Sequence, residues 1–519
     1  MARRWVFYPF LLAIYPILFL YAQNYNEAHA HDLIIPMVVM LGLSSVVFIA
    51  AWPILRDAAR AGLIAVVAIA VFVTIGQISG WIDGFLESLS MVWVYREVHL
   101  WTPLSIGLEV ALAVAAIYGI TCWKTARAAT PFINAFALVL LVIPLFSVIR
   151  HRLSEPKMFS GPRAAFATTR RPNQPPDVYY IILDGFARFD VMKEQFGFDY
   201  QPILERLERK GFYVARGSTS NYCQTPLSLS SSLNSSYLNA LFAPDSDDKS
   251  VLNEWIGDGA VVRTFKSMGY RYVSYASGFS ETEQTKADDY RTIYPRYSEF
   301  QRLLISHTPL ESLFPQSIFN DSYSLARSRI KYVFDDLPTV ATLPEPTFTF
   351  AHILSPHPPF IFGADGSDVS PRGRLYFLND GDVYMNNSGN QASYLQGYRG
   401  QAEYLLGKVE KTIDAILAAS PEPPVIILQS DHGSGLNLMT DSAKETDMHE
   451  RMCILNAIYI PGGKYGELYQ KITPVNSFRA IFNTCFNGHL EYLPDRNYFS
   501  TWSRPFMFDD VSDRVEKKP

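Results

Sequence analysis

Hydrophobic and polar positions divide the chain into two parts with different patterns. Nearly all long uncharged stretches lie before residue 150, whereas later apolar runs are short and alternate with polar segments. A helix needs about twenty apolar residues to cross the hydrocarbon core of a bilayer. Five stretches come near that length: 6–22, 33–55, 61–79, 103–123 and 131–149. We therefore predict a five-helix transmembrane domain over residues 1–150.

Basic residues beside these stretches predict their orientation, because cytoplasmic loops carry an excess of Lys and Arg. Such residues precede the first stretch, separate the second from the third and separate the fourth from the fifth: Arg3, Arg4, Arg56, Arg60, Lys124 and Arg127. Five spans then leave everything after Arg150 on the outer side. The first span also resembles a cleavable signal peptide, and cleavage would leave that location unchanged.

Two connecting segments differ in composition from the spans. The loop 80–102 is rich in Trp, Phe and Tyr, so it is either a segment lying in the membrane interface or a helical cap between spans. Residues 151–176 are rich in Pro, Arg and Thr and lack apolar periodicity. They predict a linker between the membrane domain and a globular part.

Residues 177–519 alternate strand and helix signals, which predicts one α/β domain with a mostly parallel sheet between helices. The strand signals are apolar runs bounded by Gly, Pro, Asp or Ser: 178–183, 271–276, 347–354, 425–429 and 454–460. Helical periodicity covers three segments between them: 202–210, 261–268 and 394–419. In such folds ligands collect at the carboxyl ends of the strands.

Polar residues with metal-binding chemistry follow two of these strands. Asp184 ends the first run, and Asp431 and His432 follow the run 425–429. In a parallel arrangement they emerge at the same edge of the sheet, where two carboxylates and an imidazole suit a divalent metal. The structural alternative is that Asp184 and Asp431 only form a turn or cap a helix.

Thr225 is a candidate nucleophile at the start of a helix. Pro226 favours the first helical position, which makes Thr225 the predicted N-cap. The simplest interpretation stops at capping. The functional interpretation adds that a helix N-terminus favours negative charge, so that it would stabilise both an alkoxide and the phosphate it attacks.

Two histidines lie near the end of the third predicted strand, 347–354. His357 lies in a loop with Pro on both sides and can donate to a leaving oxygen, although a lone loop His is usually structural. His352 lies inside the strand run and is predicted to be core. The segment 447–451, Asp-Met-His-Glu-Arg, either contributes substrate contacts or forms a solvated surface turn, and we favour the turn.

Charge and cysteine content place few limits on the possible partners and disulfides. The formal net charge is −5 and the pI about 6.1, so the chain has no general basic surface and nucleic acid is not an expected partner. Cys122 falls in a predicted span. Cys453 and Cys485 either form a disulfide or stay buried free thiols, and Cys223 is predicted to serve packing.

The ordered set of motifs resembles the sulfatase and alkaline phosphatase superfamily, and within it the membrane-anchored lipoteichoic acid synthase-like group. The motifs are Asp184 with Gly185, Thr225 at a helix start, the loop from His357 to Phe360, and Ser430 to Gly433. That group has five N-terminal spans and an extracellular catalytic domain. The resemblance implies a multi-pass protein of the bacterial inner membrane with a periplasmic sulfatase-like catalytic domain.

The resemblance also implies site residues. A metal ion would be held by Asp184, Thr225, Asp431 and His432, with Thr225 as the nucleophile and His357 contacting the phosphate. Departures from the pattern matter. The first ligand is Asp where lipoteichoic acid synthases have Glu, and their set of residues for glycerol phosphate has no match in 274–285. The signature of a second metal is absent, as is the Cys motif that sulfatases convert to formylglycine.

We therefore expect one divalent ion (manganese, magnesium or zinc) and phosphoryl transfer or hydrolysis through Thr225 on a phospholipid-derived or cell-envelope substrate. The expected partner is a membrane lipid or lipid-linked molecule, because a soluble substrate would not require five spans. Two alternatives remain. One is a catalytically inert lipid-binding sensor or scaffold, and the other is a membrane-tethered sulfatase or phosphatase that uses water.

Overall fold

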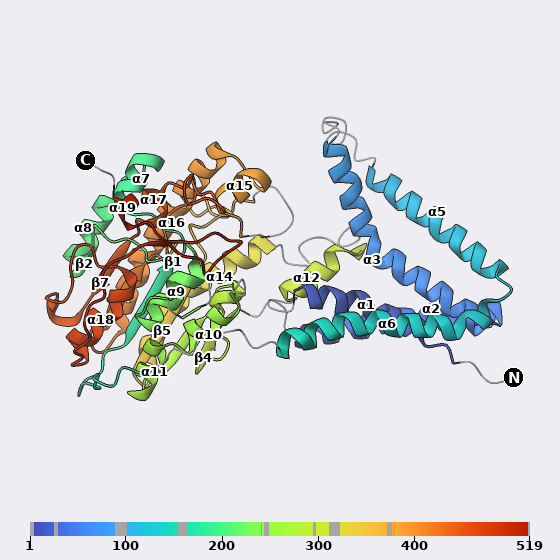
Figure 1. Ribbon diagram of the computed structural model, residues 1–519, viewed down its shortest axis with the longest axis horizontal. Coiled ribbons are helices and arrows are strands. Elements are labelled where there is room, and N and C mark those ends of the chain that lie inside the picture. The colour runs from blue at the N-terminus through green and yellow to red at the C-terminus, as the bar shows by residue number, and fades with distance from the viewer. Residues whose placement is uncertain are drawn as a thin grey trace. The chain divides into compact units, whose positions relative to one another are not determined.

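The chain forms two compact units. The structure, a computed structural model, describes residues 5–24, 30–88, 101–153, 164–239, 241–242, 249–293, 297–310, 322–370, 376 and 378–516. One unit comprises Met1–Glu155 with Pro295–Asp321, and the other comprises Pro156–Tyr294 with Ser322–Pro519. Figure 1 labels their elements.

The first unit contains the apolar helices that the hydropathy pattern predicts. They are α1 (Tyr8–Gln23), α2 (Ile34–Leu55), α3 (Ala58–Ser88), α5 (Trp101–Cys122) and α6 (Ala126–Leu153). By length and composition, two helical stretches of the described residues are long and apolar enough to cross a membrane, Ala30–Leu55 and Ala126–Arg150. The other three apolar stretches are shorter, so the count of five spans stays a prediction. Of the loop 80–102, residues 89–100 lie outside the described residues.

A short helix from much later in the chain packs within this unit. The ring of Phe300, on α12 (Glu299–Ser306), meets Tyr21 of α1 edge-on at 6.1 Å between centroids. Gln301 Nε2 donates a hydrogen bond to the carbonyl oxygen of Asp32. Sequence analysis assigns residues 297–310 to the extracytoplasmic domain, because nothing in their pattern distinguishes them from its other helices.

The second unit is built on a seven-stranded sheet in the order β2-β7-β6-β1-β5-β3-β4. Only β7 runs antiparallel to its neighbours in this sheet of the described chain, which confirms the predicted mostly parallel arrangement. The strands are β1 (Val178–Leu183), β2 (Phe212–Val214), β3 (Arg271–Tyr275), β4 (Asp289–Arg291), β5 (Thr347–Ile353), β6 (Val425–Gln429) and β7 (Asn456–Tyr459).

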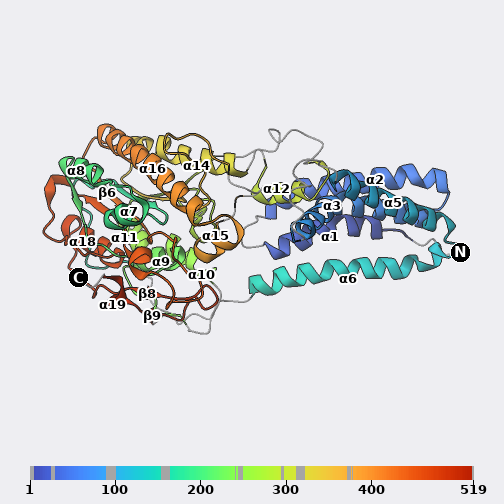
Figure 2. The ribbon, with the colours of Figure 1, turned by 90° about the horizontal axis from the view of Figure 1, so that it is seen from above.

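Both faces of the sheet are covered by helices, as Figures 1 and 2 show. The odd-numbered residues of β1 belong to one core, which also includes residues of α7 (Phe189–Phe196), α8 (Gln201–Arg209), α14 (Ser322–Asp336) and α16 (Gln391–Ala419). The even-numbered residues belong to a second core with α9 (Thr225–Asn234), α10 (Val251–Gly257), α11 (Ala260–Ser267) and α18 (Pro474–Cys485). Strands buried on both sides read as continuous apolar runs, and this is why the sequence marks them so clearly.

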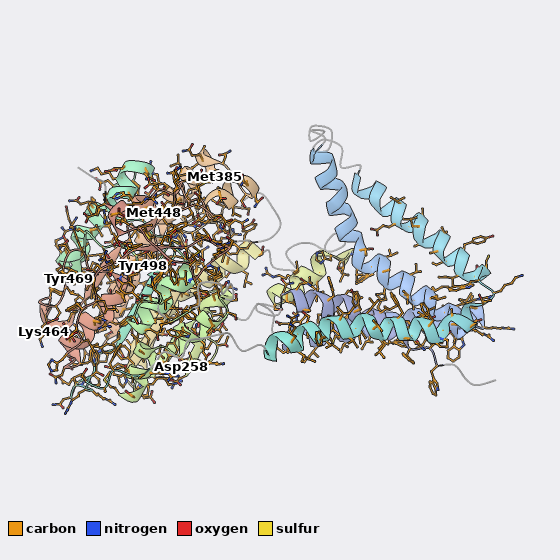
Figure 3. The ribbon with its side chains drawn as sticks, in the orientation of Figure 1. Asp258, Met385, Met448, Lys464, Tyr469 and Tyr498 are labelled. Atoms are coloured by element: carbon orange, nitrogen blue, oxygen red, sulfur yellow. The ribbon has the colours of Figure 1, made fainter. Side chains whose placement is uncertain are left out.

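The side chains of this unit fill the space between sheet and helices (Figure 3). Shorter elements complete it: α15 (Gly381–Asn387), α17 (Met448–Met452), α19 (Ser512–Val515), β8 (Tyr498–Phe499), β9 (Asp509–Asp510), and the 3-10 turns η2 (Ser280–Thr282), η4 (Leu337–Thr342) and η5 (Pro461–Gly463), with η1 (Ala30–Leu33) in the first unit.

Secondary structure follows the sequence pattern wherever the apolar run is long. All five predicted strands and all three predicted helices form, with ends shifted by at most three residues. The three-residue strands β2 and β4 are not predicted, because so short a run carries no periodicity. All four cysteines are free, so a disulfide between Cys453 and Cys485 is wrong and the alternative of free thiols holds.

Candidate active site

Two strand ends bring together the predicted acidic ligands. β1 and β6 pair in parallel with Ile182 opposite Gln429, so the residues that follow each strand emerge side by side. The backbone N–H of Gly185 donates to Asp431 Oδ1 at 3.0 Å. Gly185 has φ +69°, and a Cβ there would lie 3.4 Å from the ring of His432. Glycine therefore permits both the turn and the close approach.

Thr225 is presented to this edge by α9. The N-cap of α9 is Gln224 rather than the predicted Thr225, and no side chain caps the helix. The prediction is wrong by one position, because the Thr225 hydroxyl has a different partner. Its Oγ1 lies 3.1 Å from His432 Nε2. Ser228 Oγ donates to the carbonyl oxygen of Asp431 at 2.7 Å and so fastens the helix to the strand end.

His432 turns an unprotonated nitrogen toward the other three groups. Its Nδ1 lies 2.9 Å from the carbonyl oxygen of Gly433, which can only accept, so the proton sits on Nδ1. The lone pair of Nε2 then faces Thr225 Oγ1, Asp431 Oδ2 at 3.4 Å and Asp184 Oδ1 at 3.5 Å. Burial lowers the pKa of His432, which favours the neutral ring that binds metals.

These four groups fit a divalent cation. Asp184 Oδ1 and Asp431 Oδ2 are buried and have no hydrogen-bond partner among the residues that the structure describes. Leaving two carboxylates together without a counter-charge costs several kcal/mol, and a bound cation would offset that cost. Two carboxylate oxygens, one imidazole nitrogen and one hydroxyl suit magnesium, manganese or zinc. We call Asp184, Thr225, Asp431 and His432 the metal side.

His352 is buried in β5, as predicted, but it is more than a core residue. Its Nε2 lies 3.3 Å from Asp184 Oδ2, and its Nδ1 lies 2.9 Å from Thr282 Oγ1. The two imidazoles of His352 and His432 therefore flank the carboxylate of Asp184, one at each oxygen. Burial alone would raise the pKa of Asp184, but the nearby rings of His357 and His352 hold it well below the usual range.

His357 lies at the end of β5, where its backbone N–H donates to the carbonyl oxygen of Asp184 at 3.1 Å. Its Nδ1 is 2.6 Å from the carbonyl oxygen of Pro358, so that nitrogen carries the proton. Its Nε2 is 3.8 Å from Asp380 Oδ2. The ring centroids of His357 and His432 are 6.3 Å apart, which places the loop histidine beside the metal side.

Asp380 is a site residue that the sequence analysis does not identify, and Arg451 lies in the segment 447–451, whose substrate contacts were the less favoured alternative. Arg451 Nη1 donates to Asp380 Oδ2 at 2.7 Å, and Tyr394 donates to the other oxygen of Asp380 at 2.7 Å. Burial would raise the pKa of Asp380, but His357 and Arg451 bring it below its usual value. We call His357, Asp380 and Arg451 the guanidinium side.

The segment 447–451 is therefore not the solvated surface turn that we favoured. It enters α17, where Glu450 and Arg451 are 1% and 2% exposed. Glu450 accepts hydrogen bonds from Ser434 Oγ and the Leu436 N–H, both at 2.6 Å, and so fixes the loop that follows His432. The sequence offered one signal that this segment is buried, namely its position just before the apolar run 454–460.

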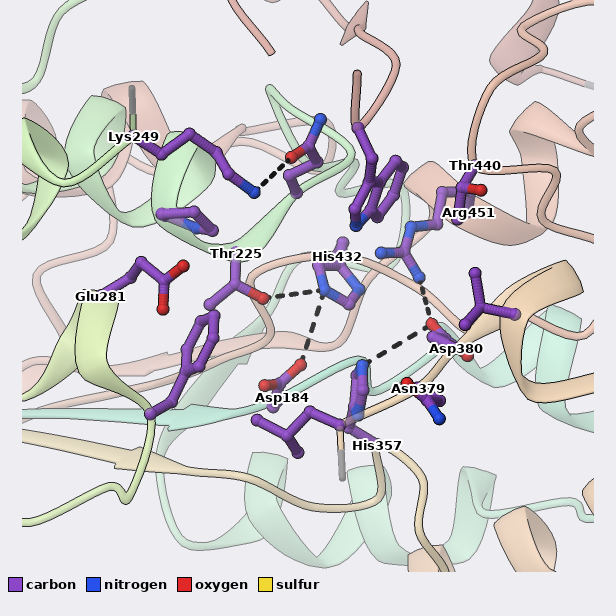
Figure 4. A pocket seen from close by; sticks show the side chains of 16 residues that line it. Asp184, Thr225, Lys249, Glu281, His357, Asn379, Asp380, His432, Thr440 and Arg451 are labelled. Carbon is purple, nitrogen blue, oxygen red and sulfur yellow. Dashed lines mark hydrogen bonds and ion pairs between the residues drawn. The ribbon is translucent and has the colours of Figure 1, made fainter. Parts of the chain in front are cut away.

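The two sides line one cavity of about 260 Å³ (Figure 4). Its lining includes Asp184, Thr225 and His432 from the metal side and all three residues of the guanidinium side. The other lining residues are Gln224, Pro226, Lys249, Phe279, Glu281, Leu378, Asn379, Val383, Thr440 and Trp502. The cavity thus holds a hydroxyl at a cation site, a histidine able to donate a proton and a fixed positive charge.

Comparison with known proteins gives matches among solved structures only. No family model and no curated protein matches the chain. The periplasmic domain of EptC from Escherichia coli in complex with zinc is similar at 12% identity and a TM-score of 0.44, over 69% of this chain and 99% of that one. Full-length lipooligosaccharide phosphoethanolamine transferase A from Neisseria meningitidis is similar at 13% identity and a TM-score of 0.40, over 94% and 96%.

A phosphonate monoester hydrolase of Agrobacterium radiobacter is also similar, at 11% identity and a TM-score of 0.38, over 62% of this chain and 80% of that one. TM-scores below 0.5 at such identities carry no argument about the activity of this chain. The case for a function depends on its own side chains.

Proposed function

We propose that the chain is a membrane-anchored, metal-dependent phosphoryl transferase or hydrolase of the sulfatase and alkaline phosphatase superfamily, with Thr225 as its nucleophile. One observation carries the proposal. Thr225 Oγ1 lies 3.1 Å from the unprotonated nitrogen of His432, which in turn lies within 3.5 Å of one carboxylate oxygen of Asp184 and one of Asp431. A hydroxyl that only capped its helix would face the backbone instead.

The chemistry of the metal side follows from its donors. Asp184, Asp431 and His432 would hold a divalent ion, which would supply a Lewis acid beside the hydroxyl and the phosphate. Thr225 would first lose its hydroxyl proton to solvent, and its Oγ would then attack phosphorus while the bond from phosphorus to the leaving oxygen breaks. The position of Thr225 in the first turn of α9 adds the positive end of a helix dipole to the same place.

The proton balance assigns a role to His357. Its Nδ1–H is held by the carbonyl oxygen of Pro358, and its Nε2 lines the cavity beside Asp380. In its protonated form, His357 would give the Nε2 proton to the leaving oxygen. An acceptor hydroxyl or water would then displace Thr225 from phosphorus, return a proton to His357 and restore the free enzyme.

The apolar helices of the first unit support a lipid or lipid-linked substrate at the outer face of the bacterial inner membrane. Helices α2 and α6 carry many exposed large apolar side chains, among them Ile54 and Phe132. Such side chains are stable in a bilayer and costly in water. The basic residues Arg56 and Lys124 favour the cytoplasm for one end of these helices, which supports a catalytic unit on the outer side.

The proposal is tested by metal content and turnover of the purified full chain. We expect one divalent ion per chain and hydrolysis of a chromogenic phosphodiester that stops when a chelator removes the ion and resumes when it is restored. Thr225→Ala should keep the metal within a factor of about ten and lose turnover. A chain that binds no stoichiometric metal, or a Thr225→Ala variant with wild-type turnover, would contradict the proposal and favour an inert lipid-binding protein.

A further inference from the structure

Arg451 has an unusual environment for a charged side chain. It is the largest of the fully buried side chains, and it also lines the cavity beside Thr225. A guanidinium group is normally exposed, because removing its charge from water costs several kcal/mol unless partners replace the water. Its partners therefore indicate why the fold keeps it there.

Three segments of the site hold the guanidinium in a fixed orientation. Nε donates to the carbonyl oxygen of Cys223 at 2.9 Å, two residues before Thr225. Nη1 donates to Asp380 Oδ2 at 2.7 Å and lies 3.4 Å from the carbonyl oxygen of Gly433, the residue after His432. The carbon at the centre of the group lies 5.9 Å from the centre of the Trp502 ring, which stabilises the cation from one face.

These contacts leave some N–H donors of the Arg451 guanidinium without a partner among the described residues. Arginine has five N–H donors, and the hydrogen bonds found for Arg451 within the described residues come from Nε and Nη1. Nη2 is not among the buried atoms that lack a partner, so it is open to the cavity. Figure 4 shows the guanidinium of Arg451 and its ion pair with Asp380.

Charge balance indicates what this group would bind. If a divalent ion were held there, the charges of Asp184, Asp431 and an ionised Thr225 would give the metal side a net charge of about −1 before a phosphate enters. Attack on a negatively charged phosphoryl group then needs a positive group on the far side of the cavity. Lys249 also lines the cavity, but burial lowers the pKa of its ammonium group and its Nζ lies 3.4 Å from Gln224 Oε1.

We infer that Arg451 is the residue that binds the nonbridging oxygens of the transferred phosphoryl group, and that Asp380 and Trp502 position it. This deepens the proposed function, on which it rests, by assigning the oxyanion contact to a group outside the metal side. Nη2 carries the two N–H donors that have no partner in the described part of the chain, and hydrogen bonds from a charged guanidinium to phosphate oxygens are stronger than neutral ones.

The inference is tested by binding of inorganic phosphate, which needs no turnover. The metal-loaded full chain in detergent is titrated with phosphate in a calorimeter, as wild type and as Arg451→Gln. We expect Arg451→Gln to weaken phosphate binding by roughly tenfold to a hundredfold, the factor expected for charge-assisted hydrogen bonds. Phosphate affinity equal to wild type in a folded, metal-loaded Arg451→Gln chain would overturn the inference.

Arg291→Gln is the matched control, because Arg291 makes an equivalent 2.7 Å ion pair with Asp336 and does not line the cavity. It should leave phosphate affinity unchanged, and an equal loss in both variants would mean that Arg451 acts only through stability. If Arg451→Gln does not fold, Arg451→Lys replaces it, with an expected loss of about threefold to tenfold and the same overturning result.

Failure of the proposed function gives a different result. If Thr225→Ala keeps full turnover while phosphate binding still depends on Arg451, then the nucleophile is wrong and the anion site stands. If Thr225→Ala abolishes turnover while Arg451→Gln binds phosphate as wild type does, then the anion site is wrong and the nucleophile stands.

Discussion

The metal side and the guanidinium side face the same cavity but are built in different ways. The metal side takes Asp184 and Asp431 from the ends of adjacent parallel strands, whose backbones are fixed by the sheet. The guanidinium side takes His357 and Asp380 from loops and Arg451 from the five-residue helix α17. Strand ends would hold the groups of the metal side in the fixed geometry that a metal ion requires, whereas the loop groups depend on one another for position.

This difference has an energetic counterpart. On the metal side two carboxylate oxygens have no hydrogen-bond partner in the described chain, so a bound cation would stabilise this side. On the guanidinium side Arg451 and Asp380 form an ion pair at 2.7 Å that needs no metal. The first side should therefore respond strongly to metal removal, and the second should keep its arrangement without metal.

The largest effect is expected from Asp431→Asn. The amide removes one charge from the metal side, and because its NH₂ group would face Asp184 or His432, it cannot replace an anionic ligand. We expect metal content to fall well below one ion per chain and turnover to fall at least about 1,000-fold, equivalent to roughly 4 kcal/mol of transition-state stabilisation. Elemental analysis with parallel kinetics checks this. Full metal content in this variant would show that the cation does not depend on Asp431.

A smaller effect is expected from His357→Gln on the other side of the cavity. This variant removes the proton donor but none of the groups on the metal side, so metal content should stay at the wild-type value. Turnover should fall by about 100-fold, and less for a substrate whose leaving group, such as p-nitrophenolate, needs no proton. An equal loss for good and poor leaving groups would rule out His357 as the acid.

His352→Gln separates a ligand-orienting role from a core role. The amide can still approach Asp184 Oδ2 and Thr282, but it lacks the rigid imidazole that links them at 3.3 and 2.9 Å. Groups that orient metal ligands typically contribute 10- to 100-fold in metal affinity, so a competitive chelator titration should show a loss in that range. A variant with lower thermal stability but wild-type metal affinity would return His352 to a purely structural role.

The residues of the metal side could be predicted because each lies next to a clear secondary-structure signal in the sequence. Asp184 and Asp431 follow apolar strands that are buried on both faces, and Thr225 precedes a Pro at a helix start. Strand pairing then converts sequence position into spatial position without knowledge of the loops. Even here the predicted N-cap, Thr225, is one residue away from the observed N-cap, Gln224.

The guanidinium side could not be predicted in the same way. Asp380 lies in a loop before α15, and its proximity to Arg451 depends on tertiary packing between segments 71 residues apart. Arg451 belongs to a segment of five residues with three charged or titratable side chains in succession, which resembles a surface turn. Its burial and its contacts with Cys223, Asp380 and Gly433 show that it faces inward.

The smallest effect is expected outside both sides, at His449 and Asp190. Hydrogen bonds with Asp190 and Cys453 raise the pKa of His449 to about 10, and Nε2 lies 3.5 Å from Asp190 Oδ2. A folded-state pKa above that of the unfolded chain means that this stabilisation is complete below pH 6.5 and is lost as the pH rises toward 10. His449→Gln should remove about 1 kcal/mol at pH 6 and much less near pH 10.

Thermal melts at several pH values check this prediction, with Asp190→Asn expected to reproduce the same pH dependence. Metal content should not change in either variant, since neither residue lines the cavity. A pH-independent loss of stability in His449→Gln would mean that the ring contributes packing rather than charge.

The central claim is that the Thr225 hydroxyl becomes covalently bonded to phosphorus. The most direct measurement is intact-mass and peptide analysis of the metal-loaded chain after brief incubation with vesicles containing phospholipid and rapid acid quenching. We expect an added phosphoryl-containing mass on the peptide that carries Thr225, present in wild type and absent in Thr225→Ala. Turnover of the same vesicles with no adduct on Thr225, or an adduct of equal yield in Thr225→Ala, would contradict it.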